Sequence, residues 1–153
     1  FRINDMDDRD DCDNGLGVDF QMTFVDIAIL DDINYKVNHS LRYKPDVGSH
    51  YQKADESRRL GTGDCEDYAI LKAQELKEAG VDVSLLTIAV CTTRKSKQLH
   101  AVCLVPSRRR VGIFKRRWQD TTVVLDNLSD NIYRIENTGY VITNKYPASR
   151  WMV

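Results

Sequence analysis

The sequence predicts an α+β fold in which helices come first along the chain and pack on an antiparallel β-sheet. Up to Gly80, apolar residues recur three and four positions apart, which is the period of a helix with one buried face. After Gly80 they form short β-branched runs of strand length. Helices followed by strands, rather than alternating with them, are typical of the α+β class.

Three stretches are predicted to be helical. Residues 20–39 carry a stripe with helical spacing, made of Phe20, Phe24, Ile27, Leu30, Ile33 and Val37. Residues 51–60 are a candidate short helix, ended by the glycines that follow. A third helix is expected over 65–79, with Asp64 as its N-cap and Gly80 as its C-terminal stop.

Five stretches are predicted to be strands, and all of them follow Gly80. They are residues 83–91, 99–105, 121–126, 139–143 and 149–153. The polar segment between the first two suits an antiparallel connection.

Length and charge predict one domain and exclude some partners. The 153 residues fit a single core, and we expect an irregular acidic arm over 1–19 followed by one domain over 20–153. The net charge of -1 gives no global field for nucleic acid. The acidic run 5–13 and the basic run 107–117 are expected to be solvated loops. No apolar run approaches the ~18 residues that cross a bilayer, so no membrane insertion is expected.

The four cysteines do not share one environment. Their spacing matches no zinc site, because the sequence has no C-x-x-C. Cys91 and Cys103 lie inside apolar runs and are expected to be buried, whereas Cys12 lies in the acidic arm. Cys65 differs, because it stands in GTGDCEDYA at the predicted start of a helix. There the helix dipole and free N–H groups favour the thiolate, so Cys65 is a candidate nucleophile.

A nucleophilic cysteine needs a base, and the base needs a group that orients it. His39 is expected on the surface at a helix end, and His50 follows a Pro/Gly loop without a predicted place. His100 opens an apolar strand, and Asp126 ends the next one. If those strands pair, His100 and Asp126 are neighbours, and both can face the start of the Cys65 helix.

Four segments together resemble the family of bacterial transglutaminase-like cysteine proteinases. They are VNHSLRYKPD (37–46), GTGDCEDYAILKAQELKEAGV (61–81), LHAVCLV (99–105) and VVLDNL (123–128). The resemblance implies a papain-like, transglutaminase-core fold and a thiol protease with Cys65 as nucleophile, His100 as base and Asp126 as orienting residue. At two positions where the family usually has tryptophan and proline, this chain has Tyr51 and Ala54.

The resemblance also implies a metal, partners and a compartment. It implies Ca²⁺ bound by acids that flank the nucleophile, which here are Asp64 and Glu66, with Asp67 as a third candidate. Carboxylates suit this hard cation. It further implies a periplasmic protease that acts on a protein substrate such as a cell-surface biofilm adhesin, and an inhibitory membrane receptor.

Two other functions fit the same residues. An acyl transferase or amidase shares the triad and the thioester, so the residues do not separate it from a peptidase. A calcium-dependent binding module on this fold would use Asp64 and Glu66 to contact a partner, although the complete triad argues against this reading.

Overall fold

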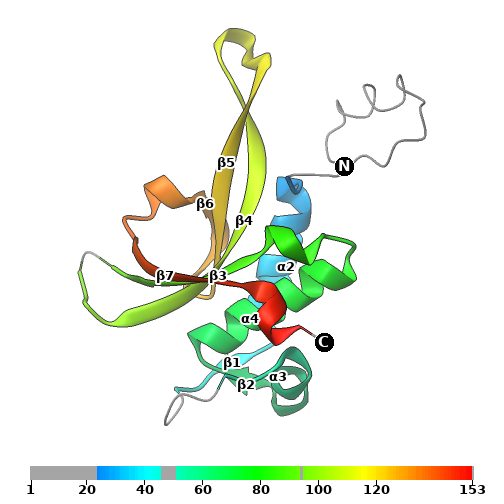
Figure 1. Ribbon diagram of the computed structural model, residues 1–153, viewed down its shortest axis with the longest axis vertical. Helices are drawn as coiled ribbons and strands as arrows, with labels where there is room; N and C mark the ends of the chain where they lie inside the picture. The colour runs from blue at the N-terminus through cyan, green and yellow to red at the C-terminus, as the bar shows by residue number, and fades with distance from the viewer. Residues whose placement is uncertain (1–23, 46–50, 94, 153) are drawn as a thin grey trace.

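The computed structural model describes residues 24–45, 51–93 and 95–152, and it confirms the α+β fold. Within this part, three α-helices lie on a five-stranded antiparallel sheet (Figure 1). The helices are α2 (Ile27–Asn38), α3 (Ala54–Leu60) and α4 (Cys65–Glu78). The sheet has the order β6-β5-β4-β3-β7, made of β3 (Thr87–Thr92), β4 (Leu99–Val111), β5 (Arg117–Asp126), β6 (Ser129–Arg134) and β7 (Val141–Pro147). A separate parallel pair joins β1 (Arg42–Tyr43) to β2 (Thr62–Gly63).

The three predicted helices are present, with later starts for two of them. Helix α2 begins at Ile27, because Asp26 is its N-cap and accepts a hydrogen bond from the Ala28 N–H. Residues 20–23 of the predicted first helix lie outside the described residues. Helix α3 begins at Ala54 rather than at 51. Helix α4 has Asp64 as its N-cap, as predicted, and the residue that follows its C-cap is Gly80, with φ 102°.

Helix α4 is the central element of the core. It packs against β4 and β5 on one side and against α2 and α3 on the other. The core on this face of the sheet includes Leu30, Val37, Tyr68, Leu71, Leu76, Ile88, Cys103, Val105, Val123 and Leu125. Burial of this apolar face fixes which way α4 points, and therefore where its N-terminus and Cys65 lie.

The opposite face of the sheet has a smaller core of its own. Ala89, Cys91, Val102, Leu104 and Val124 alternate with the residues of the helix-side core. The connection from β6 to β7 crosses this face, and Ile135, Tyr140 and Ile142 pack against the small core. This connection carries Tyr140 away from the β6 edge of the sheet and across its face. Within the described residues, no helix is both long and apolar enough to cross a membrane.

Three parts of the strand prediction were wrong. Val83–Leu85 is a 3₁₀ turn, capped by the Asp82 side chain on the Ser84 N–H, so the strand begins only at Thr87. Residues 149–152 of the last predicted strand do not form a strand, because Ala148–Trp151 is another 3₁₀ turn, and Val153 lies outside the described residues. Strand β6 was not predicted, since its sequence SDNIYR is mostly polar.

The basic segment 107–117 is not a loop. Ser107 to Val111 pairs with Arg117 to Thr121, so β4 and β5 continue as a long hairpin. Its outer part has polar side chains on both faces, and such a strand lacks the alternation by which strands are recognised in a sequence.

Candidate active site

The turn before α4 presents Cys65 at the first position of the helix. Gly61 adopts a left-handed conformation with φ 70°, which ends α3 and starts the turn. Gly63 leaves room for Asp67, because a Cβ at Gly63 would lie 2.7 Å from the Asp67 Cβ. The Asp67 carboxylate accepts hydrogen bonds from the backbone N–H groups of Asp64, at 3.0 Å, and Gln52, at 2.8 Å. Asp67 therefore braces the loop that holds the thiol.

The Cys65 thiol lies against β4, beside the residue that follows His100. Its Sγ has a backbone hydrogen bond with Ala101 and donates to Glu66 Oε2 at 3.4 Å. Burial, and then the charge of Glu66, raise the pKa of Cys65 to about 12. The expectation that the helix start favours the thiolate is therefore wrong for the protein groups alone. Desolvation and the neighbouring carboxylate of Glu66 disfavour the thiolate.

His100 and Asp126 are hydrogen-bonded neighbours. His100 begins β4 and Asp126 ends β5, and the antiparallel pairing of these strands brings His100 Nε2 within 2.8 Å of Asp126 Oδ1. With Nε2 directed at the carboxylate, Nδ1 is the ring nitrogen left to exchange a proton with another group. The structure thus brings the predicted base and orienting residue together, next to the strand position that Cys65 contacts.

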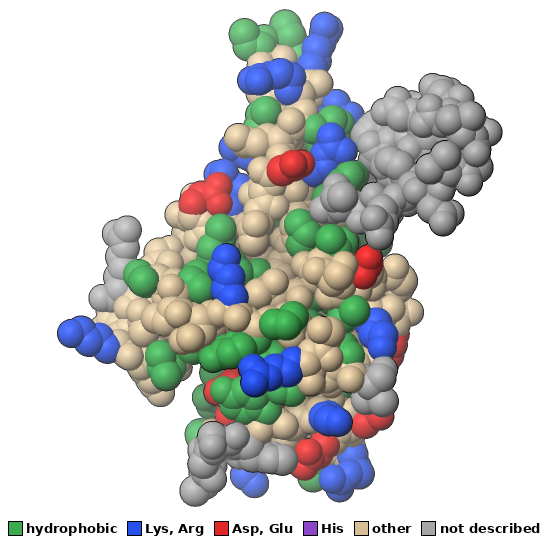
Figure 2. Space-filling model, in the orientation of Figure 1, with side chains coloured by type: hydrophobic (Ala, Val, Ile, Leu, Met, Phe, Trp, Pro, Cys, Tyr) green, Lys and Arg blue, Asp and Glu red, His purple; other side chains and the backbone are tan. Residues whose placement is uncertain are grey.

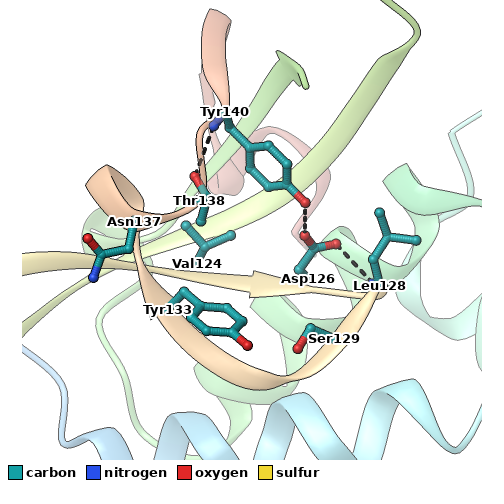
Figure 3. A pocket seen from close by; sticks show the side chains of 8 residues that line it. All are labelled: Val124, Asp126, Leu128, Ser129, Tyr133, Asn137, Thr138 and Tyr140. Atoms are coloured by element: carbon teal, nitrogen blue, oxygen red, sulfur yellow. Dashed lines mark hydrogen bonds between the residues drawn. The ribbon is translucent and has the colours of Figure 1, made fainter. Parts of the chain in front are cut away.

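Two groups besides His100 form hydrogen bonds with the Asp126 carboxylate. The Tyr140 hydroxyl donates to Asp126 Oδ2, and the Leu128 N–H donates to Oδ1 at 3.0 Å (Figure 3). Burial raises the pKa of Asp126, but the hydrogen bonds from His100 and Tyr140 outweigh burial, so this pKa lies below its usual value. Asp126 is therefore a carboxylate with a fixed orientation.

Tyr140 is a site residue that the sequence analysis missed. Its hydroxyl reaches Asp126, and its ring lies edge-on to the His100 ring, with centroids 5.7 Å apart. Tyr140 also lines a cavity of about 240 Å³ with Asp126, and the exposed Tyr133 lines the same cavity (Figure 3). No local motif marks Tyr140, since its place depends on the β6 to β7 connection across the sheet.

The three predicted metal ligands do not play equal parts. Asp67 accepts backbone hydrogen bonds on both oxygens and is buried. Burial, and then a side-chain hydrogen bond with Asp64, raise the pKa of Glu66. The side chains of Glu66 and Asp64 are therefore close together. Among the described residues, no three His, Cys, Asp or Glu side chains form a ready metal cluster. Asp64 and Glu66 thus offer two carboxylates of the kind Ca²⁺ takes, towards the 6–8 oxygen ligands it usually has.

A cavity of about 460 Å³ lies beyond Tyr51 and is lined also by Tyr146, Arg150 and Trp151. Burial, and then the negative charge of Glu66, raise the pKa of Tyr51, so its ring lies near the acids beside Cys65. The Tyr51 and Trp151 rings are 5.8 Å apart. The position where the resembling family has tryptophan therefore forms an aromatic wall near the nucleophile here as well.

The remaining candidates lie away from this cluster. His39 is on the surface, as expected, with Nε2 2.9 Å from Asp130 Oδ2. Cys91 and Cys103 are buried, as expected. His50 and Cys12 lie outside the described residues.

Known proteins resemble this chain in fold and in family. None of the curated proteins searched matches the chain. Among solved structures, Legionella pneumophila LapG matches with a TM-score of 0.64 and 22% identity, over 76% of this chain and 62% of that one. Its calcium-bound form matches with a TM-score of 0.65, 22% identity and coverage of 78% and 65%. An EGTA-treated form matches with a TM-score of 0.64, 22% identity and coverage of 78% and 62%. The chain spans less than two-thirds of the length of these LapG structures.

These likenesses establish the fold, and a sequence profile extends the comparison to the family. A profile described as bacterial transglutaminase-like cysteine proteinase matches residues 6–152, nearly the whole chain. The chain belongs to the family of bacterial transglutaminase-like cysteine proteinases.

Proposed function

We propose that the protein is a cysteine peptidase that hydrolyses a peptide bond in a protein substrate through a thioester on Cys65. The observation that carries the proposal is the His100–Asp126 hydrogen bond of 2.8 Å, on the strand that the Cys65 thiol contacts. This arrangement supports Cys65 as nucleophile, His100 as base and Asp126 as orienting residue, the three roles that acyl-transfer chemistry of this kind needs.

The chemistry follows from these three residues. His100 Nδ1 takes the Cys65 proton as Sγ attacks the scissile carbonyl carbon, and it then delivers that proton to the leaving amine. Water next attacks the thioester, with His100 taking its proton, and the acid product leaves with Sγ restored as a thiol. Asp126 keeps the Nε2–H of His100 directed at itself, which leaves Nδ1 to exchange a proton with the thiol.

The oxyanion formed on attack needs two donors. The backbone N–H of Cys65 is one, because the first-turn N–H groups of a helix have no partner within the helix. The Tyr51 hydroxyl is our candidate for the second, since electrostatic coupling with Cys65 and Glu66 places it near the nucleophile.

We further propose that Ca²⁺ binds at Asp64 and Glu66, next to the turn that Asp67 braces. Both acids raise the pKa of Cys65, and Glu66 has the greater effect of the two. A bound divalent cation would offset this negative charge and hold the loop, without ligation by the thiol, which suits softer metals. The calcium-bound LapG structure among the neighbours supports the choice of metal.

The biological setting is proposed from the likeness to LapG. We propose a periplasmic enzyme that trims a cell-surface adhesin involved in biofilms and that is held by an inhibitory membrane receptor. The chain spans less than two-thirds of the length of the LapG structures, so the compartment, the adhesin and the receptor are proposals drawn from this likeness.

The test is hydrolysis of a peptide mixture in Ca²⁺, with new amino termini identified by mass spectrometry. The native protein is expected to create new termini, and Cys65→Ala and His100→Ala to create none, while Cys91→Ala serves as a matched cysteine control. Reaction in ¹⁸O water distinguishes the outcomes, because hydrolysis places the label in the new carboxyl terminus. Incorporation of an added amine without label would identify an acyl transferase instead, and cleavage by Cys65→Ala would refute the assignment.

A further inference from the structure

The outer end of the β4–β5 hairpin has an exposed apolar apex. The hairpin extends beyond the rest of the molecule, at the top of the view in Figure 1. Its turn has left-handed backbone at Gly112, Phe114 and Lys115, with φ values of 90°, 66° and 53°. Ile113 is 79% exposed and Phe114 is 80% exposed, more than any other large hydrophobic side chain in the described residues. Two adjacent apolar side chains in this position add nothing to the core.

Basic side chains surround this apex. Arg109, Arg110, Lys115, Arg116 and Arg117 are all exposed, and none forms an ion pair with a carboxylate in the part of the chain that the structure describes. Figure 2 shows basic and hydrophobic side chains together at this end of the molecule. Five of the 22 Lys and Arg residues of the chain lie within residues 109–117, a stretch without Asp or Glu, so this hairpin has a local positive charge on a chain whose net charge is -1. We call residues 109–117 the hairpin tip.

The hairpin tip is too far from the catalytic residues to bind the scissile segment of a substrate. His100 is near the start of β4 and Val111 at its end. At roughly 3.3 Å per residue, these positions are about 36 Å apart along the strand. A contact at the hairpin tip therefore leaves the active site open. Binding of the scissile segment does not explain why apolar and basic side chains are exposed at the tip.

We propose that the hairpin tip binds the surface of an anionic lipid membrane. The order of its groups matches the layers of such a surface, since the apolar apex reaches the hydrocarbon boundary while the cations behind it meet the charged headgroups. A nucleic acid would offer Ile113 no stacking partner. An acidic protein would satisfy the cations but would need an apolar pocket placed over both apex residues.

Vesicle co-sedimentation tests the proposal without any dependence on peptidase activity. We expect the native protein to sediment with vesicles of phosphatidylglycerol and phosphatidylcholine and not with phosphatidylcholine alone, and added salt to weaken binding. Neutralising Lys115→Gln and Arg116→Gln together should weaken binding on the order of 25-fold, since each cation near an anionic surface contributes about fivefold. Ile113→Asn with Phe114→Asn should also weaken it, and asparagine tolerates the left-handed backbone at Phe114.

Matched controls make the result specific to the tip. Lys44→Gln with Arg59→Gln removes the same charge elsewhere, and Leu60→Asn removes an exposed apolar side chain from α3; each should bind like the native protein. Unchanged melting temperatures would show that every variant is folded. Equal loss in tip and control variants would overturn the proposal, and so would native protein that fails to bind anionic vesicles at low salt. The latter result is expected if an acidic protein, or the acidic arm of the same chain, occupies the tip.

Discussion

Tyr140 donates a hydrogen bond to Asp126 on the carboxylate oxygen that His100 does not use. His100 and the Leu128 N–H share Oδ1, so both oxygens of the buried carboxylate are engaged. Asp126 cannot turn without breaking at least one of these bonds. Tyr140 therefore acts on the proposed chemistry as a positioning residue, through Asp126 and His100.

Tyr140→Phe should lower kcat/KM roughly 10- to 100-fold, because a hydrogen bond to a charged group contributes about 1.5–3 kcal/mol. The loss should fall on kcat, since Tyr140 orients the base rather than binds substrate. Tyr133→Phe is the matched control, because Tyr133 is exposed, lines the same cavity and should retain full activity. Steady-state kinetics on one cleaved peptide would measure both, and equal effects of the two changes would argue against the positioning role.

The contrast between Cys65 and Tyr140 shows how much of this site a sequence can reveal. The segment GTGDCEDYA combines glycines, an N-cap and a cysteine within a few residues, so its turn and its helix are encoded locally. His100 and Asp126 were found because each lies on a recognisable apolar strand. Tyr140 reaches Asp126 only through the path of a connection across the sheet, which no local pattern reports. The sequence also did not reveal that the pKa of Cys65 is raised, because the burial that raises it depends on the assembled fold.

Lys72→Met should stabilise the protein. The Lys72 side chain is 0% exposed, and its Nζ has no hydrogen-bond partner among the described residues. Burial lowers its pKa to about 7, and the charge of Asp126 only partly opposes this. Replacing an unpaired buried lysine by an apolar side chain of similar length should raise the free energy of unfolding by roughly 1–4 kcal/mol at pH 7.

The pH dependence of that gain has a definite sign. From pH 7 up to the ordinary lysine pKa of 10.5, the unfolded chain holds the Lys72 proton and the folded chain releases it. The native protein is therefore stabilised as the pH rises through this window, and the advantage of Lys72→Met should shrink across it. Denaturant unfolding at several pH values would measure this, with the exposed Lys53→Met as control. A Lys72→Met protein less stable than the native one at pH 7 would contradict the account.

Gly63→Ala should disrupt the nucleophile turn. The added Cβ would lie 2.7 Å from the Asp67 Cβ, so Asp67 must shift and loosen its bonds to Gln52 and Asp64. We expect a cost of about 1–3 kcal/mol in unfolding free energy, as for other overpacked sites, together with a large loss of activity. Gly80→Ala is the control: its φ of 102° strains alanine, but nothing lies within 4 Å. The Gly80→Ala protein should be less stable than the native protein but equally active. Thermal melting and peptide hydrolysis measure these two properties.

Calcium removal should lower both activity and melting temperature, and added Ca²⁺ should restore them, as expected for a ligand selective for the folded state. Asp64→Asn and Glu66→Gln should weaken Ca²⁺ binding in calorimetric titration of the metal-stripped protein. Asp55→Asn, on exposed α3, should titrate like the native protein. Full activity in chelator, with no heat of binding at millimolar Ca²⁺, would leave Asp64 and Glu66 as helix-start charges only.

The central claim is that His100 activates Cys65, and the rate of alkylation by iodoacetamide tests it without a known substrate. In Ca²⁺, mass spectrometry of the native protein should show Cys65 modified far faster than the buried Cys91 and Cys103. The thiolate is the reacting form, so His100→Ala should slow Cys65 towards the rates of the other two. A Cys65 that reacts no faster than Cys91, or whose rate is unchanged in His100→Ala, would contradict the account.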